Sequence, residues 1–256
     1  MKRIVPYIIT LIVIGSVFQH CDKSSSLSVN STSSQTTTGV GGSMARYTIL
    51  GDYLYTVDNS NLNVFDITDG ANPVLKNTVK IGFSIETIYP FKDKLFIGSS
   101  SQVYIYSVAN PANPKQLGSA ISPQVLRRCD PVVAKDTVAF ATLRTNGVCG
   151  GTQSILAVYD IKDINNPVQK ATLNMDEPYG LGYADTVLYV CNGSNGLKVV
   201  SVANPYSPYV LKTITGGITF TDVIPYGNIL ICWVSDGVVL YDISKNNNPV
   251  LITKIN

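Results

Sequence analysis

The chain has 256 residues, of which 45% are apolar and only 14% are charged, and its formal net charge is +2. The 19 basic and 17 acidic residues are scattered, so the sequence offers no basic stripe for nucleic acid. His20 is the only histidine and lies in a predicted export signal. A mature protein without histidine excludes Ser-His-Asp catalysis, Cys-His catalysis and His-ligated zinc.

The N-terminus predicts export. Lys2 and Arg3 precede an apolar run over residues 8–18, which is too short to span a bilayer as a helix and is typical of a signal peptide. Cys21 follows, and residues 1–21 resemble a bacterial lipoprotein signal, in which the cysteine is lipidated and becomes the mature N-terminus. The alternative is ordinary cleavage near Ser16.

Residues 22–43 are rich in serine, threonine and glycine and contain no aromatic side chain. A segment of this composition cannot bury enough apolar surface to fold, so we expect a flexible stalk between the anchored Cys21 and a folded head. The lipid anchor would be the only contact with the membrane.

Five regularly spaced prolines divide residues 44–256 into repeats. They lie 41, 53, 41 and 41 residues apart, at Pro73, Pro114, Pro167, Pro208 and Pro249. A period near forty with strand-like sequence between the marks is typical of a β-propeller. The sequence therefore predicts an all-β fold, with five blades of four antiparallel strands.

Each repeat begins with a short apolar segment expected to form its first strand. These segments are Tyr47–Leu50, Thr87–Pro90, Pro131–Ala134, Gly180–Tyr183 and Asp222–Pro225. Two further apolar runs follow, and the proline turn then leads to a fourth, alternating strand. The simplest interpretation is a ring of five blades that closes by packing, without strand exchange between the termini.

The third repeat carries twelve extra residues, which lengthen two connections on one face of the propeller. Cys129 lies in one connection and Cys149 in the other, so we expect a Cys129–Cys149 disulfide in an oxidising compartment. The alternative is two unpaired thiols. Cys191 and Cys232 fall inside strands and are expected to be buried free thiols.

A charged residue precedes the first turn of every blade. These residues are Arg46, Glu86, Asp130, Glu177 and Asp222. They are candidates for a ring around the channel mouth that binds a sugar or a cation such as Ca²⁺, because convergent acidic oxygens suit that ion. The alternative, which we favour, is that each charge caps backbone groups of a neighbouring blade.

Other polar side chains are expected on the same face. They are Arg127, Arg144, Tyr179 and Asn192. Trp233, the only tryptophan, falls inside a repeat strand, so the sequence predicts core packing for it in preference to ligand stacking.

The third and fourth repeats carry a resemblance to a known family. The runs CDPVVAKDTVAFATLRTNGVCGG (Cys129–Gly151), SILAVYDIKDINNPV (Ser154–Val168) and EPYGLGYADTVLYVCNGSNGLKVVSV (Glu177–Val202) resemble LVIVD-repeat proteins. The resemblance implies a β-propeller lipoprotein that is exported and anchored in the outer membrane, facing the periplasm or the cell surface. It implies no particular activity or substrate.

Three functions remain open. We expect a non-enzymatic, envelope-anchored propeller that presents a loop-rich face to a protein or a glycan, with no nucleic-acid partner and no cofactor apart from a possible Ca²⁺ ion. The alternative is a hydrolase or lyase of extracellular polysaccharide that uses Asp130, Glu177 and Arg144. A purely structural envelope protein is the third.

Overall fold

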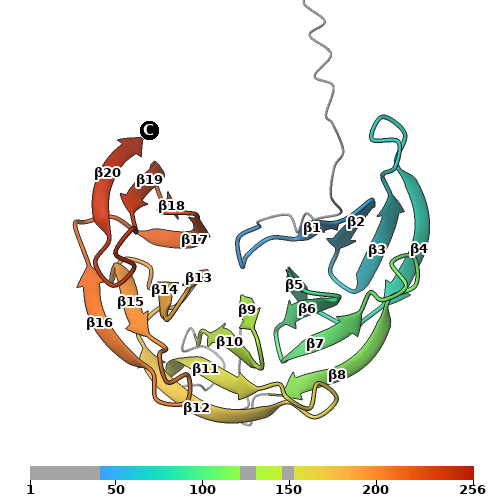
Figure 1. Ribbon diagram of the computed structural model, residues 1–256, viewed down its shortest axis with the longest axis horizontal. Helices are drawn as coiled ribbons and strands as arrows, with labels where there is room; N and C mark the ends of the chain where they lie inside the picture. The colour runs from blue at the N-terminus through green and yellow to red at the C-terminus, as the bar shows by residue number, and fades with distance from the viewer. Residues whose placement is uncertain (1–40, 122–130, 146–152) are drawn as a thin grey trace, which may run out of the picture. The chain divides into compact units, whose positions relative to one another are not determined.

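Twenty β-strands form five four-stranded antiparallel sheets in the computed structural model, which describes residues 41–121, 131–145 and 153–256. The predicted all-β propeller with five blades of four strands is confirmed (Figure 1). Within the described residues, no helix is long and apolar enough to cross a bilayer. Cys21, Arg127, Cys129, Asp130 and Cys149 lie outside the described residues.

We call each sheet a blade and number the blades in chain order. Blade 1 comprises β1 (Tyr47–Leu50), β2 (Tyr53–Val57), β3 (Asn61–Asp66) and β4 (Val74–Lys80). Blade 2 comprises β5 (Ile85–Phe91), β6 (Lys94–Ser99), β7 (Gln102–Ser107) and β8 (Lys115–Ile121). Blade 3 comprises β9 (Val132–Lys135), β10 (Val138–Leu143), β11 (Ser154–Asp160) and β12 (Val168–Met175). Blade 4 comprises β13 (Leu181–Ala184), β14 (Val187–Cys191), β15 (Leu197–Ser201) and β16 (Tyr209–Ile214). Blade 5 comprises β17 (Phe220–Tyr226), β18 (Ile229–Val234), β19 (Gly237–Asp242) and β20 (Val250–Ile255).

The same backbone bond recurs in every blade and fixes which residues are equivalent. The amide of the residue after the third strand donates to a carbonyl in the first turn over 2.8 Å, as from Ile67 to Asp52 in blade 1 and from Ile243 to Asn228 in blade 5. The residue before that turn carbonyl has a left-handed backbone in all five blades. These residues are Gly51, Lys92, Asp136, Asp185 and Gly227. Blades 1 and 5 use glycine at this position, where a positive φ involves no Cβ clash.

Four hydrophobic clusters hold the blades together, and each one joins two neighbours in sequence. They lie between blades 1 and 2, 2 and 3, 3 and 4, and 4 and 5. Tyrosine hydroxyls add polar ties, because Tyr55 of blade 1 donates to Pro111 of blade 2 over 2.9 Å and Tyr189 of blade 4 donates to Asn246 of blade 5 over 2.7 Å.

The predicted closure of the ring by packing is wrong for the described residues. A closed ring of five blades needs a fifth cluster, and none joins blade 5 to blade 1 among the residues that the structure describes. Figure 1 shows the five sheets around a common centre, with a gap between β17–β20 and β1–β4. The repeat predicts how each blade packs on the next, but it contains no information on how many blades complete a circle.

The two blades beside this gap differ in the surface that they present. In blade 5, Ile231, Trp233 and Leu240 occupy positions equivalent to Tyr55, Val57 and Val64, which are buried in blade 1. None of the three is fully buried, and Trp233 is 63% exposed. Blade 1 presents a mixed face to the gap, where Ile49, Leu54 and Phe65 lie beside polar groups.

The polar groups of blade 1 come from strands β2, β3 and β4. Thr56 pairs with Asn63 across β2 and β3, and the Thr78 hydroxyl donates to Asn63 Oδ1 over 2.9 Å. The outer face of blade 1 therefore combines polar and apolar side chains, whereas that of blade 5 is largely apolar.

Candidate functional site

A cleft of about 680 Å³ lies on the open side of the propeller, between blade 1 and blade 5. It is lined by most of the segment from Gly41 to Ile49 and, from blade 5, by Asp222, Ile224 and Trp233. We call it the open-side cleft. Its volume lies within the range of small-ligand sites.

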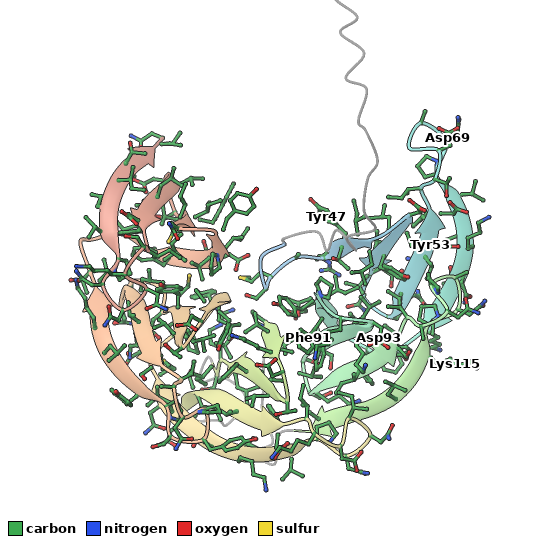
Figure 2. The ribbon with its side chains drawn as sticks, in the orientation of Figure 1. Tyr47, Tyr53, Asp69, Phe91, Asp93 and Lys115 are labelled. Atoms are coloured by element: carbon green, nitrogen blue, oxygen red, sulfur yellow. The ribbon has the colours of Figure 1, made fainter. Side chains whose placement is uncertain are left out.

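Two exposed aromatic side chains line the open-side cleft from opposite blades. Tyr47 of β1 and Trp233 of β18 are each 63% exposed. Figure 2 shows Tyr47 on the side of β1 that faces the gap. Neither residue was expected to form a site.

The prediction that Trp233 packs in the core is wrong. Along β18 it shares a face with Ile229 and Ile231, as strand alternation predicts, but no described blade covers that face. The repeat alignment did contain a signal for this position, because Trp233 falls where Val57 of blade 1 faces the neighbouring blade.

Arg46 supplies a positive charge to the open-side cleft. Its Nη2 donates to the carbonyl oxygen of Ile85 over 3.1 Å, and the side chain is otherwise exposed. The ion pairs between described residues all involve lysine, so Arg46 has no carboxylate partner within that part of the chain. This contact with blade 2 is of the backbone-capping kind considered above.

Asp222 lines the cleft as well, but its oxygens are already occupied. Oδ1 accepts hydrogen bonds from the Val223 amide over 2.9 Å and from the Ser43 hydroxyl over 3.3 Å, and the Met44 amide also donates to the carboxylate. Burial raises the pKa of Asp222 to about 6, because desolvation disfavours the charged form more than these donors favour it.

The Asp222 contacts attach the segment before β1 to the far side of the gap. Ser43, only 2% exposed, accepts a hydrogen bond from the Leu181 amide over 2.7 Å. Gly42 and Gly180 pack so closely against the Asp222 carboxylate that a Cβ at either position would clash. Residues 42–44, of which the first two were expected to end the stalk, thus connect blade 1 to blades 4 and 5.

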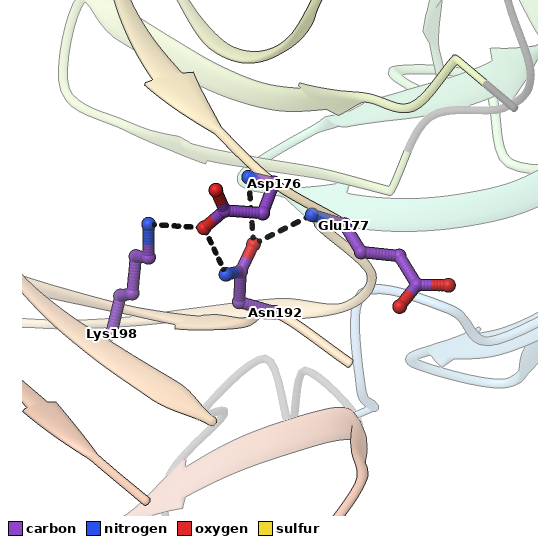
Figure 3. A network of polar contacts seen from close by, with 4 residues as sticks. All are labelled: Asp176, Glu177, Asn192 and Lys198. Carbon is purple, nitrogen blue, oxygen red and sulfur yellow. Dashed lines mark hydrogen bonds and ion pairs between the residues drawn. The ribbon is translucent and has the colours of Figure 1, made fainter. Parts of the chain in front are cut away.

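A second polar cluster holds the connection between β12 and β13. The buried Asn192 amide oxygen accepts hydrogen bonds from the backbone amides of Asp176 at 3.3 Å and Glu177 at 3.0 Å (Figure 3). Its Nδ2 donates to Asp176 Oδ2 over 2.9 Å, and Lys198 forms an ion pair with the same oxygen over 2.9 Å. This cluster holds the connection between β12 and β13 in place, and the oxygens Asn192 Oδ1 and Asp176 Oδ2 already accept hydrogen bonds within it.

Arg144 and Glu177 meet through Tyr179 beside this loop. The Arg144 guanidinium lies 3.9 Å from the centre of the Tyr179 ring, and the Tyr179 hydroxyl donates to Glu177 over 2.9 Å. The structure thus brings Glu177 of the expected ring together with Arg144, Tyr179 and Asn192 here. Two other residues of the ring, Arg46 and Asp222, line the open-side cleft.

The remaining candidates stand apart. Glu86 is exposed on β5, and no group of three or more His, Cys, Asp or Glu gathers into a metal site within the described residues. Cys191 and Cys232 are buried free thiols, as predicted.

The family model of the LVIVD repeat matches residues 41–80, which comprise the segment before β1 and all of blade 1. The match confirms the predicted LVIVD repeat, and it falls on the first repeat. No curated protein matches the chain.

Solved structures share the fold at low sequence identity. The periplasmic gluconolactonase PpgL of Pseudomonas aeruginosa has a TM-score of 0.60 at 12% identity, over 80% of this chain and 69% of that one. The computationally designed Ika8 protein has a TM-score of 0.58 at 13% identity, over 82% and 60%. Sqt1 from Chaetomium thermophilum has a TM-score of 0.56 at 14% identity, over 80% and 56%. The chain thus spans less than two thirds of the length of the last two proteins, and identities this low show the fold alone.

Proposed function

We propose that this β-propeller, whose residues 41–80 form an LVIVD repeat, is a non-enzymatic binding protein of the bacterial envelope that holds a glycan in the open-side cleft. The observation that carries the proposal is the pair of exposed aromatic rings, Tyr47 and Trp233, on the walls of one cleft. Exposed aromatic side chains offer a large, rigid apolar surface at low entropic cost.

The shape of the cleft favours a glycan over a protein partner. A concave site of about 680 Å³ suits a few sugar rings, whereas protein interfaces are larger and flatter. Sugar rings present apolar faces that stack on aromatic rings, and their hydroxyls need a few polar groups. Arg46 and the backbone of the segment before β1 provide such groups.

The arrangement of carboxylates supports binding rather than hydrolysis. Glycosidases generally use two carboxyl groups that flank the bond to be cleaved. Among the described residues that line the open-side cleft, Asp222 is the only carboxylate, and three donors already occupy it. Glu177, which the hydrolase alternative requires, interacts with Tyr179 in the second polar cluster.

Anchoring in the envelope is the second part of the proposal. It rests on the basic start, the short apolar run and Cys21. Metabolic labelling with a radioactive fatty acid should mark the wild-type chain but not a Cys21→Ser variant. Equal labelling of both chains, or of neither, would remove this part of the proposal.

Intrinsic fluorescence tests glycan binding directly, because Trp233 is the only tryptophan. Titration of the full chain with a panel of bacterial and host oligosaccharides should shift and quench its emission in a saturable way for at least one class. Tyr47→Ala should weaken that binding at least tenfold. Phe83→Ala, which removes a 75% exposed aromatic ring outside the cleft lining, should leave it unchanged. A flat titration with every sugar, or equal effects of the two variants, contradicts the proposed site.

A further inference from the structure

We infer that the glycan carries a carboxylate, as in a uronic-acid saccharide, and that Arg46 binds this group. The inference rests on the proposed function and names the ligand class for the same cleft. It depends on the two charged side chains among the described residues that line the open-side cleft, Arg46 and Asp222. The Asp222 carboxylate is already hydrogen-bonded within the protein, whereas most donors of Arg46 are not.

The guanidinium of Arg46 is available to a ligand. An arginine side chain has five N–H donors in a planar fork, and one hydrogen bond to Ile85 leaves most of them open. The side chain is exposed and lines the cleft, and no carboxylate of the described part of the chain forms an ion pair with it. Arginine in this situation favours planar anions that accept two parallel hydrogen bonds, and a carboxylate is such an anion.

The one carboxylate that the described residues contribute to the cleft does not compete for Arg46. Asp222 accepts hydrogen bonds from the amides of Val223 and Met44 and from the Ser43 hydroxyl. These contacts hold it on the blade 5 side, whereas Arg46 reaches toward Ile85 at the start of β5 in blade 2. Arg46 therefore has free N–H donors for a ligand, whereas the Asp222 carboxylate is already hydrogen-bonded to groups of the protein.

Arg46 and the two aromatic rings would contact different rings of one oligosaccharide. Arg46 and Tyr47 are adjacent in sequence but project from opposite sides of the chain, since the Arg46 guanidinium lies against β5 of blade 2 and Tyr47 faces the gap. Tyr47 and Trp233 line the cleft from the two blades that border the gap. An oligouronate that stacks one ring on Tyr47 or Trp233 would bring the carboxylate of a neighbouring ring to the guanidinium across the inner edge of β1.

The test compares two saccharides that differ only in this carboxylate. Trigalacturonate and its carboxyl-reduced counterpart, a galactotriose of the same linkage, are titrated against the full chain while Trp233 emission is followed. We expect trigalacturonate to bind at least tenfold more tightly at low salt, because charge-assisted bidentate hydrogen bonds are among the stronger polar contacts. Raising the salt concentration should reduce this preference.

Arg46 variants show whether the preference comes from this residue. Arg46→Met should abolish the preference, and Arg46→Lys should retain only part of it. Lys80→Met removes a positive charge from an exposed position on β4 and should leave the preference intact. Thermal unfolding of each variant establishes that it is folded.

The possible failures are distinguishable. If both saccharides quench Trp233 with equal affinity, or if Arg46→Met keeps the preference, the inference is overturned while the proposed glycan function stands. If neither these nor any other saccharide of the panel binds, the proposed function fails together with the inference.

Discussion

At the residue scale, the backbone conformation of Gly51 explains why glycine stands in the first turn of blade 1. Its φ is +57°, and no atom lies within 4 Å of the place where a Cβ would stand, so an alanine would meet strain from the backbone alone. The same argument applies to Gly227, with a φ of +56° in blade 5.

We therefore expect Gly51→Ala to lower the free energy of unfolding by about 1 kcal/mol, the usual cost of a left-handed conformation for a residue with a side chain. Gly70→Ala is the matched control, because Gly70 has equal space around it but no positive φ. Chemical denaturation of the two variants measures the difference. Equal effects would show that the turn does not need glycine.

Asp222 makes the stability of the fold depend on pH with an unusual sign. Burial raises its pKa to about 6, so between the unfolded value of 3.8 and this folded value the folded chain binds more protons than the unfolded chain. Its contribution to stability therefore falls as the pH rises from about 4 to about 6. Exposed aspartates such as Asp58, whose pKa hydrogen bonding to Ser60 and Asn61 lowers to about 2, act in the opposite direction at lower pH.

Comparison with Asp222→Asn isolates this contribution, because the amide cannot ionise. We expect the variant to gain stability relative to wild type by about 2 kcal/mol between pH 4 and pH 7, from a shift of roughly two pKa units. Thermal unfolding of both chains across this range provides the measurement. A constant difference between the two curves would mean that Asp222 ionises as easily in the folded chain as in the unfolded one.

At the element scale, Asn192 determines the position of the connection between β12 and β13. Its amide oxygen accepts hydrogen bonds from the backbone amides of Asp176 and Glu177. We expect Asn192→Ala to lower the free energy of unfolding by about 2 kcal/mol, because two backbone amides lose their acceptor in a partly buried place.

Lys198→Met is the control for this network. It removes the ion pair with Asp176, whose side chain is 61% exposed, and should change stability by less than about 1 kcal/mol. Chemical denaturation of the two variants measures the change in the free energy of unfolding that each one causes. If the lysine proved as important as the asparagine, the network would depend on charge rather than on backbone capping.

The elements that could be predicted from the sequence are those determined by local pattern. Tyr47–Leu50 is a strand in the structure as predicted, since its alternating residues and the glycine turn after it lie within a few positions of one another. The site was predicted only in part. Arg46 and Asp222 were predicted from their place in each repeat. Tyr47 and Trp233 were not, because their exposure depends on which blade faces have no neighbouring blade packed against them.

At the scale of the whole molecule, no hydrophobic cluster joins blades 1 and 5 within the described residues, which leaves the cleft between them and exposes Trp233. A repeat sequence contains the contacts between successive blades, because each blade offers one apolar face to the next. It does not contain the angle between them, which depends on the side chains at each interface. A ring of five can therefore be predicted as closed and still be open.

Equivalent positions in two blades test this openness in solution. Ile105 of blade 2 is 1% exposed in the cluster between blades 2 and 3, and Leu240 occupies the same place in blade 5, where it is only half-buried. Truncation to alanine removes the same number of carbon atoms from each. We expect Ile105→Ala to lower the free energy of unfolding by about 3 kcal/mol and Leu240→Ala by about 1 kcal/mol. The difference arises because truncation leaves a cavity only where other side chains surround the removed atoms on all sides. Urea denaturation of both variants, at several protein concentrations, measures the two values. If Leu240→Ala cost as much as Ile105→Ala, the outer face of blade 5 would be covered in solution, and the open-side cleft would not be free to hold a glycan.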